Sequence, residues 1–395
     1  MVEEYIFPQT TLLVSLNKMK NPIQMVDLKG QYSKIKKEID LGIQKTINNA
    51  QFIGGENVEL FKKSLESYLN VKHVIPCANG TDALQIAIMA LDLKRGEEVL
   101  VPAFTYVATA EVIGLLGLKP IMLDVDFSTF NIDLNKIESL ISKKTRAIVP
   151  VHLFGQAAPM KEILEIAKKY DLYVIEDNAQ AIGAEYFYDS NSKNKLGTLG
   201  DIGCISFFPS KNLGCFGDGG AMMTNSDELA QKVKMIANHG QSKKYHHKVI
   251  GCNSRLDSIQ ASILNTKLKY LDQYNMLRAQ AANYYDKSFK LIEEIEIPHR
   301  VKYSTHVFHQ YTLKIKNGKR DKLKSFLGDK GIPSMVYYPI PLYKQEAFRD
   351  YVENDYSLPV TEKLCEQVLS LPIHTELRVE IQNYIIENVN KFFSL

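Results

Sequence analysis

The sequence predicts an α/β protein with a mostly parallel sheet, followed by a smaller C-terminal α+β domain. Two observations predict this fold class. Between about residues 70 and 225, short β-rich runs alternate with helical stretches, and the β-rich runs are almost continuously apolar. Such alternation is typical of βαβ units around a parallel sheet. Strands that helices cover on both faces have no polar side, which accounts for the continuous runs.

The elements follow in chain order. A β-rich run at 73–79 precedes a helical stretch at 81–91, and a run at 97–103 precedes one at 105–117. The further apolar runs are PIMLDV, RAIVPVHLF, LYVIEDNA and IGCISFF, and the segment MKEILEIAKKY has helical periodicity. A long amphipathic stretch at 251–289 then leads out of the first domain. We therefore expect an N-terminal extension at 1–24, a large domain at 25–275 and a small domain at 276–395.

Composition excludes several classes of function. The 395 residues include 48 basic and 45 acidic side chains, a net charge of +3, so nucleic acid and anionic membranes are not expected partners. No apolar run reaches the roughly 18 to 20 residues that span a bilayer. Five cysteines without a CxxC pair do not predict a disulfide framework. We expect a protein of the reducing cytoplasm.

Two of the predicted strand ends carry side chains suited to a ligand, and ligands of open α/β sheets bind at these ends. In CANGTDALQ, Gly80 allows a tight turn and a helix begins at Thr81. Free amides and the positive dipole of a helix start suit a phosphate; the alternative is a simple N-cap by Thr81. In VIEDNAQAIGA, Asp177 ends a buried strand. Its carboxylate either caps the next helix or pairs with a cationic ring nitrogen.

A third strand end lies in the stretch IGCISFFPSKNLGCFG, where Lys211 is the one charged residue. Pro209 and the glycines predict an irregular turn that lets backbone approach a ligand. A lysine in such a turn is more often exposed to solvent than catalytic. The combination of a phosphate-ready helix start, a strand-end aspartate and a sheltered lysine nevertheless meets the needs of pyridoxal phosphate. This cofactor requires phosphate donors, a carboxylate for its ring nitrogen and an amine for a Schiff base.

The chain also resembles the DegT/DnrJ/EryC1/StrS sugar aminotransferases, from about Ile23 to His374. The shared blocks are CANGTDALQIA, PAFTYVATAEVIGLLG, LDVD, EDNAQA, SFFPSKNLGCFGDGGA, GCNSRLDSIQA and YYPIPLYKQ, in the order typical of the family. The resemblance implies the aspartate aminotransferase fold (pyridoxal phosphate fold type I), with a mostly parallel seven-stranded sheet. It also implies an active homodimer with shared active sites.

The resemblance further implies roles for individual residues at the cofactor. Lys211 would bond to the cofactor and move a proton between it and the substrate. Asp177 would hold the ring nitrogen, Gln180 would contact the ring hydroxyl and Tyr106 would stack on the ring. The cofactor phosphate would be bound by Gly80, Thr81 and Ser206, and by Asn253 of the neighbouring subunit.

On the substrate side, the blocks HGQSKKYHHKVIGCNSRLD and YYPIPLYKQ are most similar to one branch of this family. That branch aminates carbon 3 of UDP-2-acetamido-2-deoxy-3-oxo-glucuronate, with glutamate as amino donor, for bacterial surface polysaccharide such as lipopolysaccharide O-antigen. Arg255 would pair with the sugar carboxylate, because a guanidinium fork suits a carboxylate. His246, His247 and Tyr338 would lie near the nucleotide sugar. The chain has Tyr337 where that branch often has histidine.

Other functions stay open at this point. A dTDP-linked 3-oxo or 4-oxo 6-deoxy sugar is an alternative substrate, and a non-catalytic sensor that binds pyridoxal phosphate is an alternative function. Sugar dehydratases of this fold replace the lysine with histidine, whereas position 211 is lysine. No metal is expected, because the adjacent side chains of His246 and His247 point in different directions.

Overall fold

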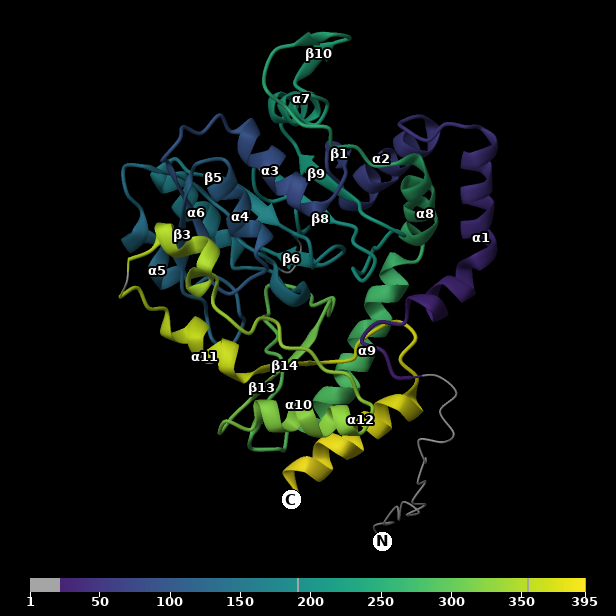
Figure 1. Cartoon of the computed structure of the whole chain (residues 1–395), viewed down its shortest axis with the longest axis vertical. Helices are drawn as coiled ribbons and strands as arrows, with labels where there is room; N and C mark the ends of the chain where they lie inside the picture. The colour runs from purple at the N-terminus through teal and green to yellow at the C-terminus, as the bar shows by residue number, and fades with distance from the viewer. Residues whose placement is uncertain (1–21, 190–191, 354, 395) are drawn as a thin grey trace.

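The computed structural model describes residues 22–189, 192–353 and 355–394. The expected extension at 1–24 therefore lies outside the described residues up to position 21. At the centre is a seven-stranded sheet with the strand order β1-β9-β8-β5-β4-β2-β3 (Figure 1). Its strands are β1 (His73–Cys77), β2 (Glu98–Pro102), β3 (Lys119–Leu123), β4 (Thr145–Ile148), β5 (Tyr173–Asp177), β8 (Ile202–Ser206) and β9 (Gly220–Thr224).

The sheet is parallel except for one strand. β9 runs antiparallel to both of its neighbours, β1 and β8, and all other pairs are parallel. The predicted fold class, α/β with a mostly parallel sheet, is confirmed. The sequence pattern alone did not identify β9, because its segment GAMMT follows a glycine-rich turn and contains no β-branched residue before Thr224.

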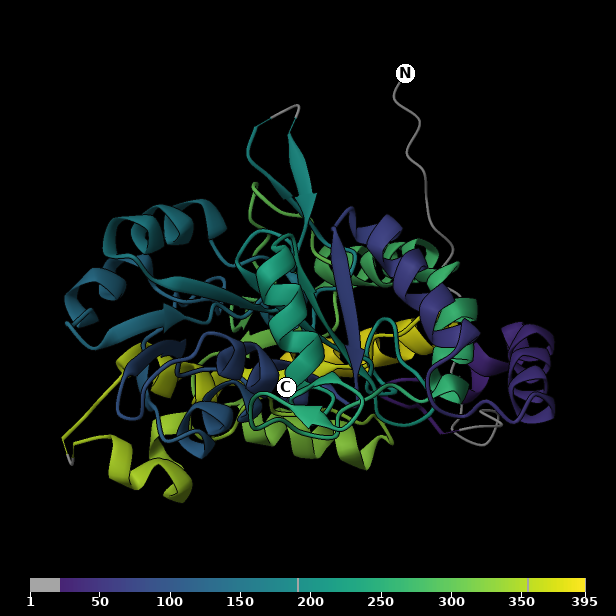
Figure 2. The ribbon, with the colours of Figure 1, turned by 90° about the horizontal axis from the view of Figure 1, so that it is seen from above.

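Alternating side chains of the central strands enter two different cores. Ile202 and Cys204 of β8 and Met222 of β9 pack with one group of helices, α3 (Gly80–Ala90), α4 (Ala108–Leu115) and α7 (Asp227–Ile236). Ile205 and Met223 point the other way, into the core under α2 (Glu56–Leu69) and α8 (Ser258–Leu268). The helices α5 (Leu134–Leu140) and α6 (Met160–Tyr170) extend this second layer across the other half of the sheet. Figure 2 shows the layers from above.

A smaller sheet of three antiparallel strands forms a separate core in the C-terminal part. Its strands are β12 (Ile295–Glu296), β13 (Tyr311–Ile315) and β14 (Val368–Leu371), with α10 (Arg320–Asp329), α11 (Pro359–Gln367) and α12 (Val379–Phe393) beside them. The helix α9 (Leu271–Phe289) joins the two parts: Asn275 bonds to the large part, and Ala282 and Phe289 lie in the small core. The expected boundary at 275 falls inside this continuous helix and stays a prediction.

The remaining elements lie at the periphery. The long helix α1 (Leu28–Asn48) packs against α8 at one side of the molecule (Figure 1). Two short hairpins are β6 (Glu185–Phe187) with β7 (Lys193–Lys195), and β10 (Gln241–Lys243) with β11 (His246–His247). Within the described ranges, no helix combines the length and apolar character that crossing a bilayer requires.

Candidate active site

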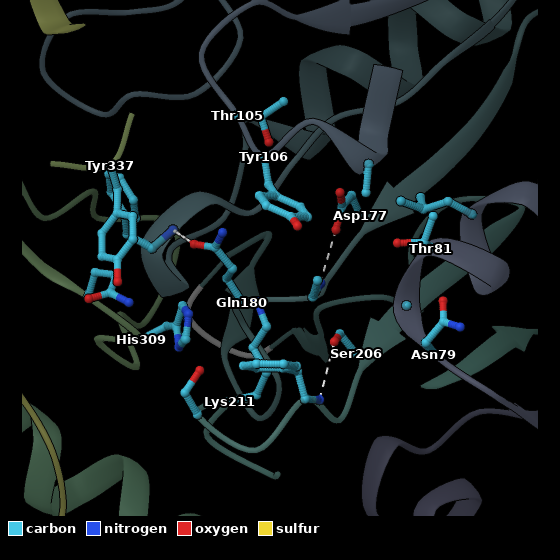
Figure 3. Close-up of a pocket in the computed structure, with 18 of the residues that line it drawn as sticks. Asn79, Thr81, Thr105, Tyr106, Asp177, Gln180, Ser206, Lys211, His309 and Tyr337 are labelled. Atoms are coloured by element: carbon cyan, nitrogen blue, oxygen red, sulfur yellow. Dashed lines mark hydrogen bonds between the residues drawn. The ribbon is translucent and has the colours of Figure 1, made fainter. Parts of the chain in front are cut away.

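A cavity of about 620 Å³ lies at the carboxyl ends of β1, β2, β5 and β8, closed on one side by the C-terminal part. It gathers most of the residues that the sequence indicated (Figure 3). Its lining includes Gly80, Thr81, Tyr106, Asp177, Gln180, Ser206, Lys211 and Tyr338. Because these residues come from segments up to 258 positions apart, Gly80 to Tyr338, only the fold brings them together.

Lys211 lies on an irregular turn directly after β8. Its amide donates to the carbonyl of Phe208 at 2.8 Å, and the amide of Cys215 donates to the carbonyl of Phe207 at 2.8 Å. The side chain is partly buried and lines the cavity. Burial lowers the pKa of the Lys211 amine to about 8, although the charge of Asp177 acts in the opposite direction. The turn thus presents an amine that is partly neutral near physiological pH.

Two buried side chains anchor this turn. The Nδ2 atom of Asn212 donates to Asn275 Oδ1 at 2.7 Å and to the carbonyl of Val307 at 2.9 Å. On the other side, Nζ of Lys267, which is 2% exposed, donates to the carbonyl of Gly214 at 2.7 Å. These bonds tie the turn to α9, to the C-terminal part and to α8, so the position of Lys211 is strongly constrained.

Asp177 is the last residue of β5 and is 5% exposed. The Thr109 hydroxyl donates to its Oδ2 at 2.7 Å, and the Ala179 amide donates to its Oδ1 at 3.1 Å. The preceding residue, Glu176, points into the core instead, because successive side chains of a strand alternate. Of these two carboxylates, only that of Asp177 lines the cavity. There it could pair with a cationic ring nitrogen.

The start of α3 forms a cradle beside Ser206. Asn79 caps the helix by accepting from the Asp82 amide at 2.8 Å, so the alternative of an N-cap by Thr81 is wrong. A Cβ atom at position 80 would lie 2.7 Å from the Cβ of Ser206, which only glycine avoids. Because α3 and β8 approach so closely, the start of α3, Thr81 and Ser206 all line the same part of the cavity. First-turn amides have no partner within a helix and suit an anion.

Three tyrosines, which we call the aromatic wall, line the cavity: Tyr106, Tyr337 and Tyr338. Gln180 donates to the hydroxyl of Tyr338 at 3.2 Å, and its Oε1 accepts from the Phe154 amide at 2.8 Å. The rings of Tyr106 and Tyr338 lie 6.4 Å apart, and Tyr106 is 57% exposed. Tyr337 also lines the cavity and is joined to Tyr338 by a cis peptide bond. The wall offers flat aromatic surfaces to a ring-shaped ligand.

Four expected residues lie outside this cavity lining: Asn253, Arg255, His246 and His247. All four are exposed, and the hairpin β10–β11 that carries the histidines projects beyond α7 (Figure 1). Between Asn253 and Arg255, the buried Ser254 donates to Asp82 Oδ2 at 2.6 Å and accepts from the Ala78 amide at 3.0 Å. This segment is thus fixed against α3 while its neighbouring side chains face outward. Their roles stay predictions.

The cavity also contains residues that the sequence analysis did not single out. His309 and Thr105 line it, and each has a buried polar atom without a hydrogen-bond partner, Nδ1 and Oγ1. Asp218 lines it as well, and Thr109 holds Asp177 in place. The segment HVFHQYT carries no motif that distinguishes His309 from a structural histidine. Among the described residues, no three His, Cys, Asp or Glu side chains form a metal-binding group.

These features fit pyridoxal phosphate, the cofactor that the sequence indicated. The Gly80 cradle with Thr81 and Ser206 would hold its phosphate, Asp177 would hold its ring nitrogen and Lys211 offers the amine. The unpartnered hydroxyl of Thr105 is available to a bound ligand.

Comparison with known proteins matches residues 33–390 to the description DegT/DnrJ/EryC1/StrS aminotransferase family. The UDP-2-acetamido-2-deoxy-3-oxo-D-glucuronate aminotransferase of Pseudomonas aeruginosa is 46% identical over 90% of this chain and 96% of its own. The UDP-N-acetyl-3-dehydro-alpha-D-glucosamine 3-aminotransferase of Acidithiobacillus ferrooxidans is 42% identical over 91% and 94%. A pleiotropic regulatory protein of Geobacillus stearothermophilus is 44% identical over 94% and 98%.

Solved structures agree with this match. A DegT DnrJ EryC1 StrS aminotransferase from Brucella abortus has a TM-score of 0.89 and 38% identity, covering 94% of this chain and 100% of the other. NtdA from Bacillus subtilis, solved with the bound cofactor PMP, has a TM-score of 0.88 and 31% identity, covering 96% of this chain and 87% of the other.

Proposed function

Because this chain belongs to the DegT/DnrJ/EryC1/StrS aminotransferase family, whose enzymes use pyridoxal phosphate, we propose a specific amino transfer for it. It is an aminotransferase that acts on a nucleotide-linked sugar with an amino donor. The amino group comes from glutamate and goes to carbon 3 of a UDP-linked 2-acetamido-2-deoxy-3-oxo sugar. The observation that carries this function is the presence of Lys211 and Asp177 in one cavity.

When bound, pyridoxal phosphate supplies an aldehyde that bonds to amines and a ring that withdraws electrons from the neighbouring carbon. The chain supplies the rest. Lys211 carries a proton on Nζ between the substrate carbon and the cofactor, and its lowered pKa makes the neutral, basic form accessible. Asp177 holds a positive charge on the ring nitrogen, because the carboxylate is buried and oriented by Thr109. Gln180 would contact the ring hydroxyl, and Tyr106 would cover the ring, since both line the cavity.

We propose a homodimer as the active unit. Gly80, Thr81 and Ser206 bind the cofactor phosphate from one subunit, and Asn253 of the second subunit completes the site. Two observations support this arrangement. Asn253 is exposed on a segment that Ser254 fixes. Large apolar side chains are also exposed at and beside the site, including Tyr106, Phe208 and Phe216. A second copy would cover this surface.

For the substrate we propose the glucuronate, UDP-2-acetamido-2-deoxy-3-oxo-glucuronate, in cytoplasmic synthesis of bacterial surface polysaccharide. The 46% identity to an enzyme named for this sugar supports it. Arg255 binds the sugar carboxylate, and His246, His247 and Tyr338 contact the nucleotide sugar. The 42% identical relative is named for the glucosamine analogue, in which a hydroxymethyl group replaces the carboxylate. The two relatives thus share UDP, the acetamido group and carbon 3 as the position of amination.

The function is tested by supplying glutamate with three keto sugars and identifying the products by mass spectrometry. The first is UDP-2-acetamido-2-deoxy-3-oxo-glucuronate, and the second is its glucosamine analogue, UDP-N-acetyl-3-dehydro-glucosamine. The third is a dTDP-linked 3-oxo-6-deoxy sugar. We expect UDP-2-acetamido-2-deoxy-3-oxo-glucuronate to be aminated most efficiently. Lys211→Ala should abolish turnover with every sugar. Preference for the dTDP sugar, or full turnover by Lys211→Ala, contradicts the proposal.

The 44% identity to a protein named as a pleiotropic regulator raises a non-catalytic sensor as a second candidate. The same experiment separates the two functions. A sensor would bind pyridoxal phosphate and the nucleotide sugar without forming an amino sugar. The cavity contains an amine and an aspartate suited to turnover, which favours the enzyme.

A further inference from the structure

His309 occupies a prominent place in the cavity that the proposed roles leave unused. It lies two residues before β13, lines the cavity and is 5% exposed. Its Nδ1 atom is buried without a hydrogen-bond partner among the described residues. Figure 3 shows His309, Lys211 and Asp177 on different sides of one pocket. A buried polar atom without a partner is costly, which indicates a group that arrives with a ligand.

The backbone around His309 is held by several independent contacts. Arg278, which is 2% exposed, donates from Nη1 to the carbonyls of Phe308, His309 and Ile373 at 3.1, 3.3 and 3.0 Å. Phe308 has a positive φ of 47°, which turns the chain at this point. A Cβ at Gly155 would lie 2.9 Å from the Phe308 nitrogen and 3.1 Å from the His309 nitrogen. The structure thus fixes this segment and leaves only the imidazole uncommitted.

The environment keeps the imidazole neutral. Burial holds the pKa of His309 well below its usual value, and the charges of Lys211 and Arg278 lower it further. A neutral imidazole has one donor and one acceptor nitrogen, and no protein contact fixes which is which. The neutral ring can donate one hydrogen bond to a carboxylate or phosphate, but it carries no positive charge that would favour an anion over a neutral group. A hydroxyl can donate to one nitrogen or accept from the other, so it suits either tautomer without a change of position.

We propose that His309 is a specificity-determining residue that binds a hydroxyl on the carbon next to the reacting carbonyl of the sugar. The inference rests on the proposed function, and for amination at carbon 3 it assigns the 4-hydroxyl. His309 and Lys211 line the same cavity, which supports this assignment, because the amine acts at the reacting carbon. The glutamate half of the reaction does not use this contact.

The test measures the two half-reactions of the holoenzyme separately in single turnovers, followed by cofactor absorbance. His309→Phe keeps a ring of similar size but removes both nitrogens. We expect its rate with glutamate to stay within about twofold of the wild type, while its rate with the keto sugar falls about tenfold, the effect of one lost hydrogen bond. His309→Asn, which restores a polar atom near the position of Nδ1, recovers part of the loss.

The decisive comparison uses the 4-deoxy analogue of the keto sugar. Wild type and His309→Phe should aminate this analogue at equal rates, because the partner hydroxyl is absent from both reactions. Equal losses in both half-reactions, or an unchanged His309→Phe effect on the 4-deoxy sugar, overturn the assignment. If the phenylalanine variant does not fold, His309→Ala gives the same comparison without added bulk. If the wild type aminates no UDP-3-oxo sugar, the proposed function fails and takes the inference with it.

Discussion

The Lys211 amine is subject to two opposing influences from its surroundings. Burial favours the neutral form and lowers its pKa to about 8, whereas the charge of Asp177 favours the protonated form. The balance leaves an amine that can act as a nucleophile and as a base without full removal from water. The reactivity of Lys211, on the turn after β8, therefore depends on a carboxylate at the end of β5.

Replacing Asp177 should change the titration of Lys211. In the cofactor-free protein we expect Lys211 to react with acetic anhydride half-maximally near pH 8. Asp177→Asn removes the charge that raises the pKa, so the midpoint should move to lower pH. Competitive labelling followed by mass spectrometry of the Lys211 peptide measures it. Asp218→Asn, also in the cavity lining, is the matched control and should leave the midpoint unchanged. A shift to higher pH would contradict this electrostatic account.

Single residues also show where sequence analysis succeeds and where it does not. Asp177 and Lys211 could be predicted because each follows an apolar strand, and such strand ends meet at one edge of a sheet. His309 could not be predicted, because its importance lies in the lack of a partner, which depends on Arg278, Gly155 and the shape of the cavity. Arg255 and Asn253 could be named only by resemblance, because both are exposed and lie outside the cavity lining of their own chain.

At the scale of elements, α3 and β8 approach each other unusually closely at the cavity. Gly80→Ala would place a methyl group 2.7 Å from the Ser206 Cβ and push the helix start away from the strand. We expect affinity for pyridoxal phosphate to fall at least about tenfold, because amides and hydroxyls around one phosphate would separate.

Gly42→Ala is the matched control for this variant. Gly42 lies within α1, and a Cβ there would have its nearest contact at 3.6 Å, an ordinary distance. This change should leave cofactor affinity unaltered and stabilise the protein by about 0.5 to 1 kcal/mol. Cofactor affinity from equilibrium dialysis, with melting temperatures, separates the two outcomes. Wild-type affinity in Gly80→Ala would show that the close approach is not needed.

The end of β5 is itself tied to the following loop. Glu176 is fully buried and accepts hydrogen bonds from the amides of Gly197, Leu199 and Gly200 at 2.9, 2.6 and 2.7 Å. His152 Nε2 lies 2.8 Å from its Oε2. Burial raises the pKa of Glu176, but the bonds from His152 and the glycine amides outweigh burial and hold it below its usual value.

Glu176→Gln should therefore destabilise the protein by about 2 to 4 kcal/mol, because an amide NH₂ would face donors. The folded-state pKa of Glu176 is lowered, so its contribution is present above the ordinary glutamate pKa and is lost as pH falls through the folded value. The deficit of the variant in urea unfolding should shrink at acidic pH. A deficit that grows as pH falls would contradict this reading.

At the scale of the whole molecule, the proposed site requires two copies of the chain. Tyr106 in the cavity lining is 57% exposed, and Asn253 and Arg255 are exposed outside that lining. If Asn253 completes the site of the partner, then Lys211 and Asn253 of any one site belong to different chains. A single chain with both residues intact would not be sufficient.

Mixing two inactive variants tests this arrangement. Lys211→Ala and Asn253→Ala should each lose most activity as homodimers. After joint unfolding and refolding, heterodimers have one site with both residues intact, so activity should recover to roughly a quarter of the wild type. Sedimentation of each variant controls for assembly. No recovery in a confirmed heterodimer would show that both residues serve the same chain.

The parallel part of the sheet could be predicted from the sequence, whereas the antiparallel strand β9 could not. The alternating pattern identified the parallel strands, since buried apolar runs and helical periods differ clearly. The reversed strand β9 was not identified, and neither was the continuity of α9 across the expected boundary at 275. Both depend on contacts distant in sequence, such as the pairing of β9 with β1.

The antiparallel direction of β9 allows Gly80 and Ser206, the two sides of the proposed phosphate site, to lie in contact. β1 and β8 are not neighbours, yet Gly80 and Ser206 touch across the strand between them. Because β9 runs backwards, it begins where its neighbours finish, and it begins with Gly220, at which a Cβ would lie 2.3 Å from the Asn79 oxygen. Gly220 thus places only main chain between β1 and β8. No side chain separates Gly80 from Ser206 at this edge of the cavity.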